Sequence, residues 1–318
     1  MRSLRRALPA ACLRLVVCLL VLGASVAVAQ RKERVDPLDP QSVEIETTDG
    51  VLLAGTLFRA DEAGKDTPVV VMLSDEGESP AVFDSLAFRL QQPSDDDATP
   101  MTVLAIALRG QGDSTKVRTP DGVTDRRGAR ITPMDAAAMV KADMEAVRKY
   151  LVDLNDAGEL NLNRLAYLGV GLGAIVATNA AAVDWSMPQL SRGKQGRDVK
   201  ALVLVSPPWK QLGLGMLDAL RQPGVQSEVA VLLTYGGESR TAKNDAERIV
   251  RQLEKGRPPA AQGADAPPPT VIDAPGESRL QGTAWLKQAG DDGAMAIAKF
   301  LQRTLAEPEL TRTQRRLD

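Results

Sequence analysis

The sequence predicts a single doubly wound α/β domain with a mostly parallel central sheet and helices on both of its faces. The continuous apolar run Val69–Leu73 is typical of a strand that is buried on both faces, and Val199–Val205 is predicted to be a further strand. Segments with helical spacing alternate with these runs, and that alternation predicts parallel strands joined by helical crossovers. The span 206–228 between two of the strands is too short for a large lid domain.

The domain is expected to begin at residue 43 with a β-hairpin. Apolar residues alternate on both sides of Asp49-Gly50, a dipeptide that supplies the positive φ of a tight turn. The next expected elements are a strand at 69–73, a helix at 81–90, a strand at 102–108 and a long polar, basic loop at 115–133.

The second half of the domain opens with an amphipathic helix predicted over 134–154, in which Met144, Val147 and Leu151 share one face. Further strands are expected at 164–168, 199–205, 229–235 and 270–273, and further helices at 174–183, 245–253 and 290–305. Residues 255–269 are rich in proline and alanine and are expected to form a surface loop. The domain is expected to end at residue 305, and 306–318 to form a polar tail.

The first 29 residues have the composition of an export signal. Four arginines without any acidic residue precede an apolar run, and small residues ending in Ala29 form a cleavage site before Gln30. An uncleaved anchor is the alternative, but the apolar run is short for a helix that crosses a membrane. The sequence therefore predicts a periplasmic or extracellular protein with no stable membrane span. After cleavage, residues 30–42 are expected to form a flexible leader before the domain.

Two absences limit the chemistry of the mature chain. Both cysteines, Cys12 and Cys18, lie in the signal, so the mature chain has no disulfide, thiolate nucleophile or cysteine-bound zinc. The whole chain contains no histidine, which removes the usual general base and the commonest metal ligand. Removal of the four signal arginines leaves 35 basic against 41 acidic residues, a balance that argues against nucleic acid as a partner.

Several motifs resemble those of the α/β-hydrolase superfamily. The segment Arg109–Ser114 is similar to the family's R-G-x-G-x-S turn, and Val203–Pro208 resembles the strand that follows the nucleophile helix. The order of elements over 43–305 is also similar to that of the family. The resemblance implies a nucleophile on a sharp strand-to-helix turn, G-x-S-x-G, with an acid and a base in later loops.

The chain departs from this pattern at the nucleophile position. The flanking glycines are Gly169 and Gly173, but the middle residue is Gly171, which has no side chain to attack a carbonyl. Gly171 is therefore interpreted as serving the geometry of the turn. The chain is expected to be a divergent member of the superfamily that does not act as a serine hydrolase.

The other expected parts of the family's machinery are also altered. Glu238 follows the strand at 229–235 and is a candidate relic of the family acid, although Ser239 or Arg240 could take that place. The late loop 275–279 has Glu277 but no imidazole, and 74–78 holds carboxylates that would repel a developing oxyanion. Both glutamates are better interpreted as solvated loop charges than as catalysts.

Other chemistries have weaker support. Gly169–Ala174 matches the dinucleotide fingerprint G-x-G-x-x-A, but no acidic residue ends the next strand at the required distance. Serines at strand ends (Ser74, Ser79, Ser114 and Ser206) have no lysine placed to activate them. Asp95–Asp97 is a candidate cation patch that is better explained as exposed charge. We therefore expect no cofactor and no metal.

The preferred function from sequence is a binding or partner-interaction module whose ligand is a protein or a small molecule. The expected binding residues line the former nucleophile crevice and are Ser74, Gly171, Leu172, Trp209 and Glu238. Trp185, Trp209 and Trp285 are alternatively interpreted as residues that fill the edges of the core. The first alternative is a hydrolase in which Glu238 or Glu277 activates water, and the second is a dinucleotide-binding protein.

Overall fold

A computed structural model describes residues 38–190, 193–257 and 270–316 of the chain. The expected export signal at 1–29 lies outside the described residues, as do most of the leader and positions 258–269 of the expected surface loop. The described part from Leu38 onward belongs to one compact unit.

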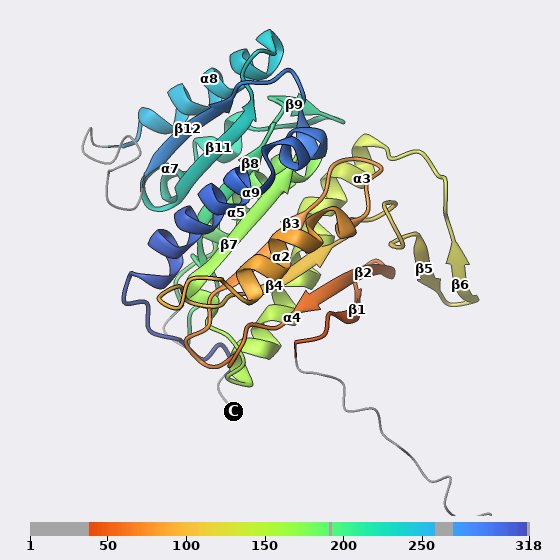
Figure 1. Ribbon diagram of the computed structural model, residues 1–318. Helices are drawn as coiled ribbons and strands as arrows, with labels where there is room; N and C mark the ends of the chain where they lie inside the picture. The colour runs from red at the N-terminus through yellow and green to blue at the C-terminus, as the bar shows by residue number, and fades with distance from the viewer. Residues whose placement is uncertain (1–37, 191–192, 258–269, 317–318) are drawn as a thin grey trace, which may run out of the picture. The chain divides into compact units, whose positions relative to one another are not determined.

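The core of this unit is a mostly parallel sheet (Figure 1). Its strands are β1 (Gln41–Glu46), β2 (Val51–Phe58), β3 (Val69–Leu73), β4 (Thr102–Ile106), β5 (Lys116–Thr119), β6 (Gly122–Asp125), β7 (Leu165–Val170), β8 (Val199–Val205), β11 (Ala230–Gly236) and β12 (Val271–Gly276). They lie in the order β12-β11-β8-β7-β3-β4-β2-β5-β6, and β1 pairs with β2. The pairs from β12 to β4 are parallel, whereas β2 is antiparallel to β4, β1 and β5. The predicted fold class is confirmed.

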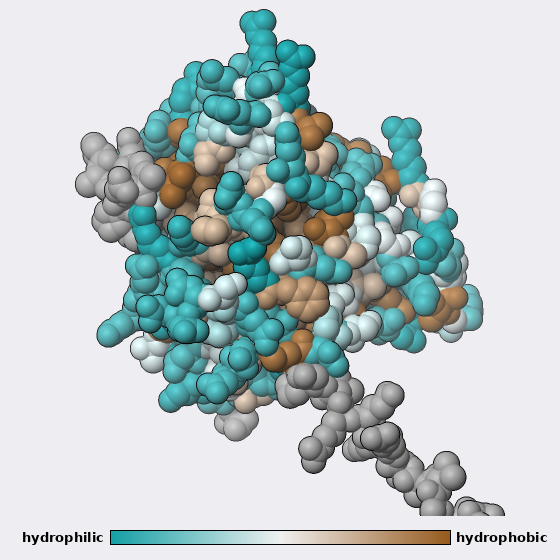
Figure 2. All heavy atoms as spheres, in the orientation of Figure 1, coloured by the Kyte–Doolittle hydropathy of each residue, from teal (hydrophilic) through white to brown (hydrophobic). Residues whose placement is uncertain are grey.

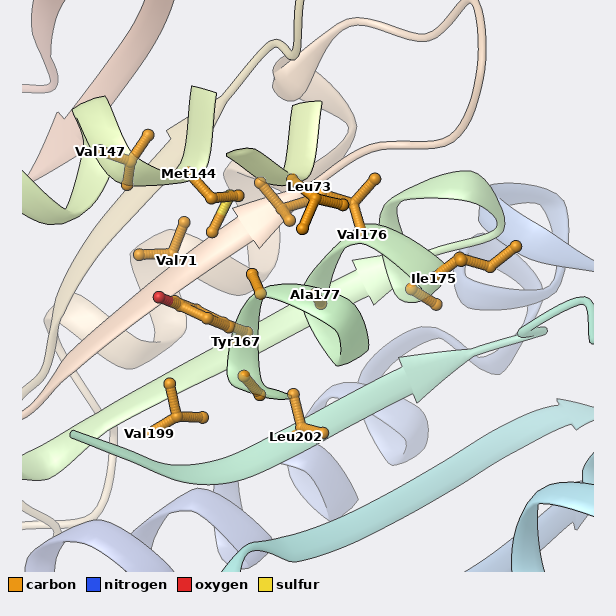
Figure 3. Packing of buried hydrophobic residues seen from close by; sticks show 14 of the residues in the cluster. Val71, Leu73, Met144, Val147, Tyr167, Ile175, Val176, Ala177, Val199 and Leu202 are labelled. Atoms are coloured by element: carbon orange, nitrogen blue, oxygen red, sulfur yellow. The ribbon is translucent and has the colours of Figure 1, made fainter. Parts of the chain in front are cut away.

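Helices cover both faces of the sheet and bury the alternate side chains of each strand. The helices are α2 (Asp84–Gln91), α3 (Pro133–Ala138), α4 (Met144–Asp156), α5 (Leu172–Ser186), α6 (Leu217–Leu220), α7 (Pro223–Glu228), α8 (Arg240–Glu254) and α9 (Gly282–Leu301). In β3, Val71 packs in one cluster with α4 and α5, and Met72 packs in a second cluster with α2 and α9. Figure 3 shows Met144 and Val147 of α4 above Val71 in the first cluster. The continuous apolar pattern of β3 follows from this two-sided burial.

Two elements differ from their expected form. The expected loop at 115–133 contains the β5–β6 hairpin, whose charged, exposed strands lack the apolar alternation that marks a half-buried strand. Helix α9 begins at Gly282 instead of at 290, and inside it the backbone departs from helical geometry at Gly290, where φ is 53° and ψ is −136°. The expected start therefore coincides with a kink inside the helix.

The C-terminal segment is polar, as expected, and it is bound to the domain through hydrogen bonds. Asn155 Nδ2 donates to Thr313 O at 3.0 Å, and Asn161 Nδ2 donates to Leu310 O at 2.7 Å. Arg315, whose side chain is 3% exposed, donates to Asp198 Oδ1 at 2.7 Å. Residues 310–315 thus form a strap over the start of β7 and the residues before β8.

None of the helices in the described ranges has the length and apolar character needed to cross a membrane.

Candidate functional site: a glycine elbow filled by Asp75

The turn between β7 and α5 has the sharp geometry that the sequence predicts. Gly171 has φ 52° and ψ −116°, and its N–H donates to Val205 O at 3.0 Å. A positive φ of this kind is accessible to glycine without the strain that a side chain would add. The sharp strand-to-helix turn is therefore present, with glycine at its centre.

The glycines on either side allow this turn to pack closely. A Cβ atom at Gly169 would overlap the backbone of Gly173 and Ala174, and one at Gly173 would overlap the carbonyl of Leu73. The start of α5 is thereby pressed against the ends of β7 and β3. This packing is a sufficient reason for glycine at both positions.

The carboxyl group of Asp75 occupies the space where a side chain at position 171 would lie. A Cβ atom built on Gly171 would overlap the Asp75 carboxyl carbon and both of its oxygens. Asp75 Oδ1 accepts hydrogen bonds from the N–H of Leu172 at 2.8 Å and from its neighbour Glu76 at 2.7 Å. A negative charge at the N-terminus of α5 is also favoured by the helix dipole. The elbow is thus occupied by a group from another loop of the same chain.

Further contacts hold the loop that carries Asp75. Ser74 is buried, and its Oγ donates to Glu78 O at 3.2 Å, so this predicted binding residue serves the turn. The hydroxyl of Thr283, at the start of α9, donates to Glu78 Oε2. Gln211 Nε2 donates to Glu76 Oε2 at 2.8 Å. The last two of these bonds tie the loop to the start of α9 and to the short strand β9 (Lys210–Gln211).

The N-terminus of α9 approaches the second oxygen, Oδ2, of the Asp75 carboxylate. Gly282 has φ 58°, and a Cβ atom on it would lie 3.5 Å from Asp75 Oδ2. Its N–H donates to Ser206 Oγ at 2.8 Å. The N-terminus of α9 thus presents a second glycine where it meets the elbow.

The predicted acid lies on the surface. The Glu238 side chain is 55% exposed, and its carboxylate lies 3.4 Å from Nε of Arg279, which is itself 85% exposed. Glu277 is exposed as well. An exposed glutamate paired with an exposed arginine is well solvated, which supports the interpretation of both glutamates as surface charges.

The tryptophans contribute mainly to packing. Trp209 is partly buried against the larger core cluster, and its backbone N–H donates to Asp245 Oδ2 at 3.2 Å. Trp185 donates its ring N–H to Val199 O at 2.9 Å, and Trp285 is buried against the other face of the sheet. Of the predicted binding residues, Gly171 and Leu172 meet at Asp75, whereas Trp209 and Glu238 have their contacts elsewhere.

The R-G-x-G-x-S motif is structural. Ser114 Oγ donates to Ala107 O at 2.6 Å and accepts from the Ala54 N–H at 2.7 Å. Arg109 pairs with Asp49 at 2.7 Å and with Asp143 at 2.6 Å. The hydrogen bonds from Arg109 lower the pKa of Asp49 to about 2, whereas burial raises the pKa of Asp143. The motif therefore joins the β1–β2 turn to the π-helical segment Met139–Asp143, which lies between α3 and α4.

Within the described ranges, no three acidic side chains gather as a metal site would require.

Asp75 is the site residue that the sequence analysis did not identify in its true place. The sequence indicated that carboxylates in 74–78 would oppose an oxyanion, but not that one of them fills the elbow. The useful signal is the combination of a glycine at the centre of the elbow with an acidic residue two positions after β3, the strand that pairs with β7. A side chain missing from one loop leaves a space that a neighbouring loop can fill.

No protein-family model and no curated protein sequence matches the chain. Solved structures do match it. Esterase Pf2001 of Pyrococcus furiosus is 15% identical with a TM-score of 0.55, over 84% of this chain and 92% of that one. The carboxylesterase EstE1 from a metagenomic library is 13% identical with a TM-score of 0.56, over 85% and 90% of the two chains.

A third match is the α/β hydrolase GrgF of Penicillium sp. sh18, which is 16% identical with a TM-score of 0.55 and covers 85% of this chain and 100% of that one. At such identities the likeness establishes the fold alone. The chain has the α/β-hydrolase fold, as its sequence motifs predict.

Proposed function

We propose that this chain is an exported protein of the α/β-hydrolase fold that does not hydrolyse substrates and acts as a binding or partner-interaction module. One observation carries the proposal: a single oxygen of Asp75 accepts both the Leu172 and the Glu76 N–H in the space of the missing nucleophile. In active enzymes of this fold, the N–H after the nucleophile and an N–H from the loop after the third strand form the oxyanion hole. Here the corresponding donors are already engaged.

The charge at this position also opposes acyl transfer. A tetrahedral intermediate would place its negative oxygen where Asp75 Oδ1 lies, and two anions cannot share the same donors. Acyl transfer at the elbow would also need a general base. No histidine is available to take over that role.

The two alternative functions are less well supported. A hydrolase that relies on Glu238 or Glu277 would need one of these exposed side chains to reach a substrate at the elbow. A dinucleotide at Gly169–Ala174 would need its pyrophosphate at the N-terminus of α5, where the carboxylate of Asp75 would repel it. The first would therefore require a glutamate to reach the elbow, and the second would require Asp75 to move away.

The proposal is tested with the purified protein on activated esters, thioesters and amides, together with a fluorophosphonate probe read by intact mass. We expect no turnover and no adduct for the wild type, Asp75→Ala, Glu238→Gln or the double variant Asp75→Ala/Gly171→Ser. The double variant regains a hydroxyl and frees the two N–H donors, but it still has no base.

Thermal unfolding of each variant provides the control for folding. Wild-type activity that is retained through every purification step and is lost in Asp75→Ala or Glu238→Gln would overturn the proposal. Such a result would identify the carboxylate on which a serine-free mechanism depends.

A further inference from the structure

The β5–β6 hairpin extends the sheet beyond the helical layers (Figure 1). β5 joins the sheet through two residue pairs with β2, Val51 with Val117 and Leu52 with Lys116. β6 pairs with β5 along its whole length and with no other strand among the residues that the structure describes. Its second edge is therefore unpaired.

This outer strand is more accessible than the other outer strands of the sheet. All four residues of β6 are exposed, whereas β1 and β12 each have a buried residue, Ile45 and Val271. Val123, in the middle of β6, is 52% exposed. Figure 2 shows hydrophobic atoms among hydrophilic ones in the region where Figure 1 labels the hairpin. An accessible strand edge with an apolar side chain is a template for pairing with another chain.

The register of the hairpin shows which backbone groups of β6 are free. Arg126 donates its N–H to Thr115 O at 2.8 Å, so this pair is of the hydrogen-bonded type. In an antiparallel pair the two types alternate, so Thr124 is bonded to Val117, whereas Val123 and Asp125 lie in non-bonded pairs. The N–H and C=O groups of Val123 and Asp125 therefore point outward.

The hairpin is basic on a chain that is acidic overall. Residues 115–130 contain five lysines and arginines and two aspartates, although the whole chain has a net charge of −2. Arg118 is paired with Glu46, and Arg127 with Asp113. Lys116, Arg126 and Arg130 are exposed, and they take part in none of the ion pairs found among the described residues. These three side chains are available to an acidic partner.

We propose that the outer edge of β6 binds an extended acidic segment of another protein as an additional strand. Backbone groups of Val123 and Asp125 would supply the pairing, and Lys116, Arg126 and Arg130 the preference for acidic side chains. A second copy of this hairpin is a poor occupant, because it would bring like charges together. Anionic lipid or nucleic acid could use the charge but not the strand edge. The inference is independent of the elbow.

The test measures binding of a short, fluorescently labelled peptide of alternating glutamate and valine by polarisation. Val123→Pro removes an outward N–H without breaking a bond to β5, and we expect it to weaken binding about tenfold. Val123→Thr keeps the N–H and should bind within about twofold of the wild type. Arg126→Glu should weaken binding about tenfold, while the same charge change in α8, Lys243→Glu, should change it less than about twofold.

A second peptide with alternate backbone nitrogens methylated keeps the charge but cannot pair as a strand, so we expect it to bind at least about tenfold more weakly. Circular dichroism checks that each variant is folded. Absence of saturable binding would overturn the proposal, as would equal affinity for the methylated peptide or for Val123→Pro. Binding to anionic vesicles in place of the peptide would also overturn it and would identify charge alone as the determinant.

Discussion

Gly171 and Asp75 together fill the space that one nucleophilic residue would take in an active relative of this fold. The turn keeps the positive φ at Gly171 because Gly169 and Gly173 press the strand and helix together. Asp75 satisfies the N–H of Leu172, which at a helix N-terminus has no partner within the helix. The same carboxylate therefore stabilises the turn and closes it to an oxyanion.

Arg109 acts at a second buried site, which is structural. Its guanidinium lies between Asp49, which is partly exposed, and Asp143, which is completely buried. A buried carboxylate without its cation is costly because water can no longer solvate it. The segment that resembles the family's R-G-x-G-x-S turn thus stabilises the fold.

We predict that Arg109→Met lowers the free energy of unfolding by about 3–5 kcal/mol, because Asp143 would be left buried and unpaired. Urea denaturation measures the change, and NMR titration should show the pKa of Asp49 rising from about 2 towards its ordinary value. The matched control is Arg127→Met, since Arg127 forms only exposed ion pairs and should cost less than about 1 kcal/mol. An equal cost for both variants would contradict this account.

At the scale of elements, the connection from α5 to β8 is held by two buried aspartates. Asp184 Oδ2 accepts the N–H groups of Asp198 and Val199 at 2.7 and 3.0 Å. Asp198 in turn accepts from Arg315 of the C-terminal strap and lies 2.9 Å from Lys194. Burial, followed by the charge of Asp198, raises the pKa of Asp184 to about 6.

This shift predicts a pH dependence of stability. Because the folded-state pKa is raised, the contribution of Asp184 is complete below its ordinary value of 3.8 and is lost as the pH rises through about 6. Asp184→Asn cannot ionise, so its stability relative to the wild type should rise by up to about 3 kcal/mol between pH 4 and pH 7. Urea unfolding across this range measures the difference, with the exposed Asp97→Asn as control. A difference that stays constant with pH would refute the prediction.

Elements with a strong periodic pattern could be predicted from sequence, and those with a tertiary cause could not. The strands predicted at 69–73 and 199–205 match β3 and β8 to the residue, because burial on both faces favours apolar residues, and all of their residues except Lys200 are apolar. β5 and β6 are exposed and charged, so no such signal exists. Their formation depends on the turn at Pro120-Asp121 and on pairing with β2.

The site was predictable to a similar extent. The three glycines of 169–173 define the elbow in the sequence itself. The hydrogen bond from Leu172 to Asp75 joins residues that are 97 positions apart. Only the parallel pairing of β3 with β7 brings the ends of these strands together, and a single sequence does not specify which loop side chain then enters the space.

At the scale of the whole described domain, charge is unevenly distributed over the sheet. The loop after β3 contributes Asp75, Glu76 and Glu78 near the elbow, whereas the hairpin at the end of the sheet is basic. An acidic elbow and a basic strand edge suit recognition of partners more readily than stabilisation of a negatively charged intermediate. The proposed binding function would depend on these two surfaces.

The most direct test of the central claim, that Asp75 fills the elbow, is a double-mutant cycle read by urea unfolding of wild type, Gly171→Ala, Asp75→Ala and the double variant. The positive φ at position 171 penalises alanine in both backgrounds, so this cost cancels in the cycle. We predict that Gly171→Ala lowers the free energy of unfolding by about 1–3 kcal/mol less in the Asp75→Ala background than in the wild type. Equal costs in the two backgrounds, to within about 0.5 kcal/mol, would contradict the account.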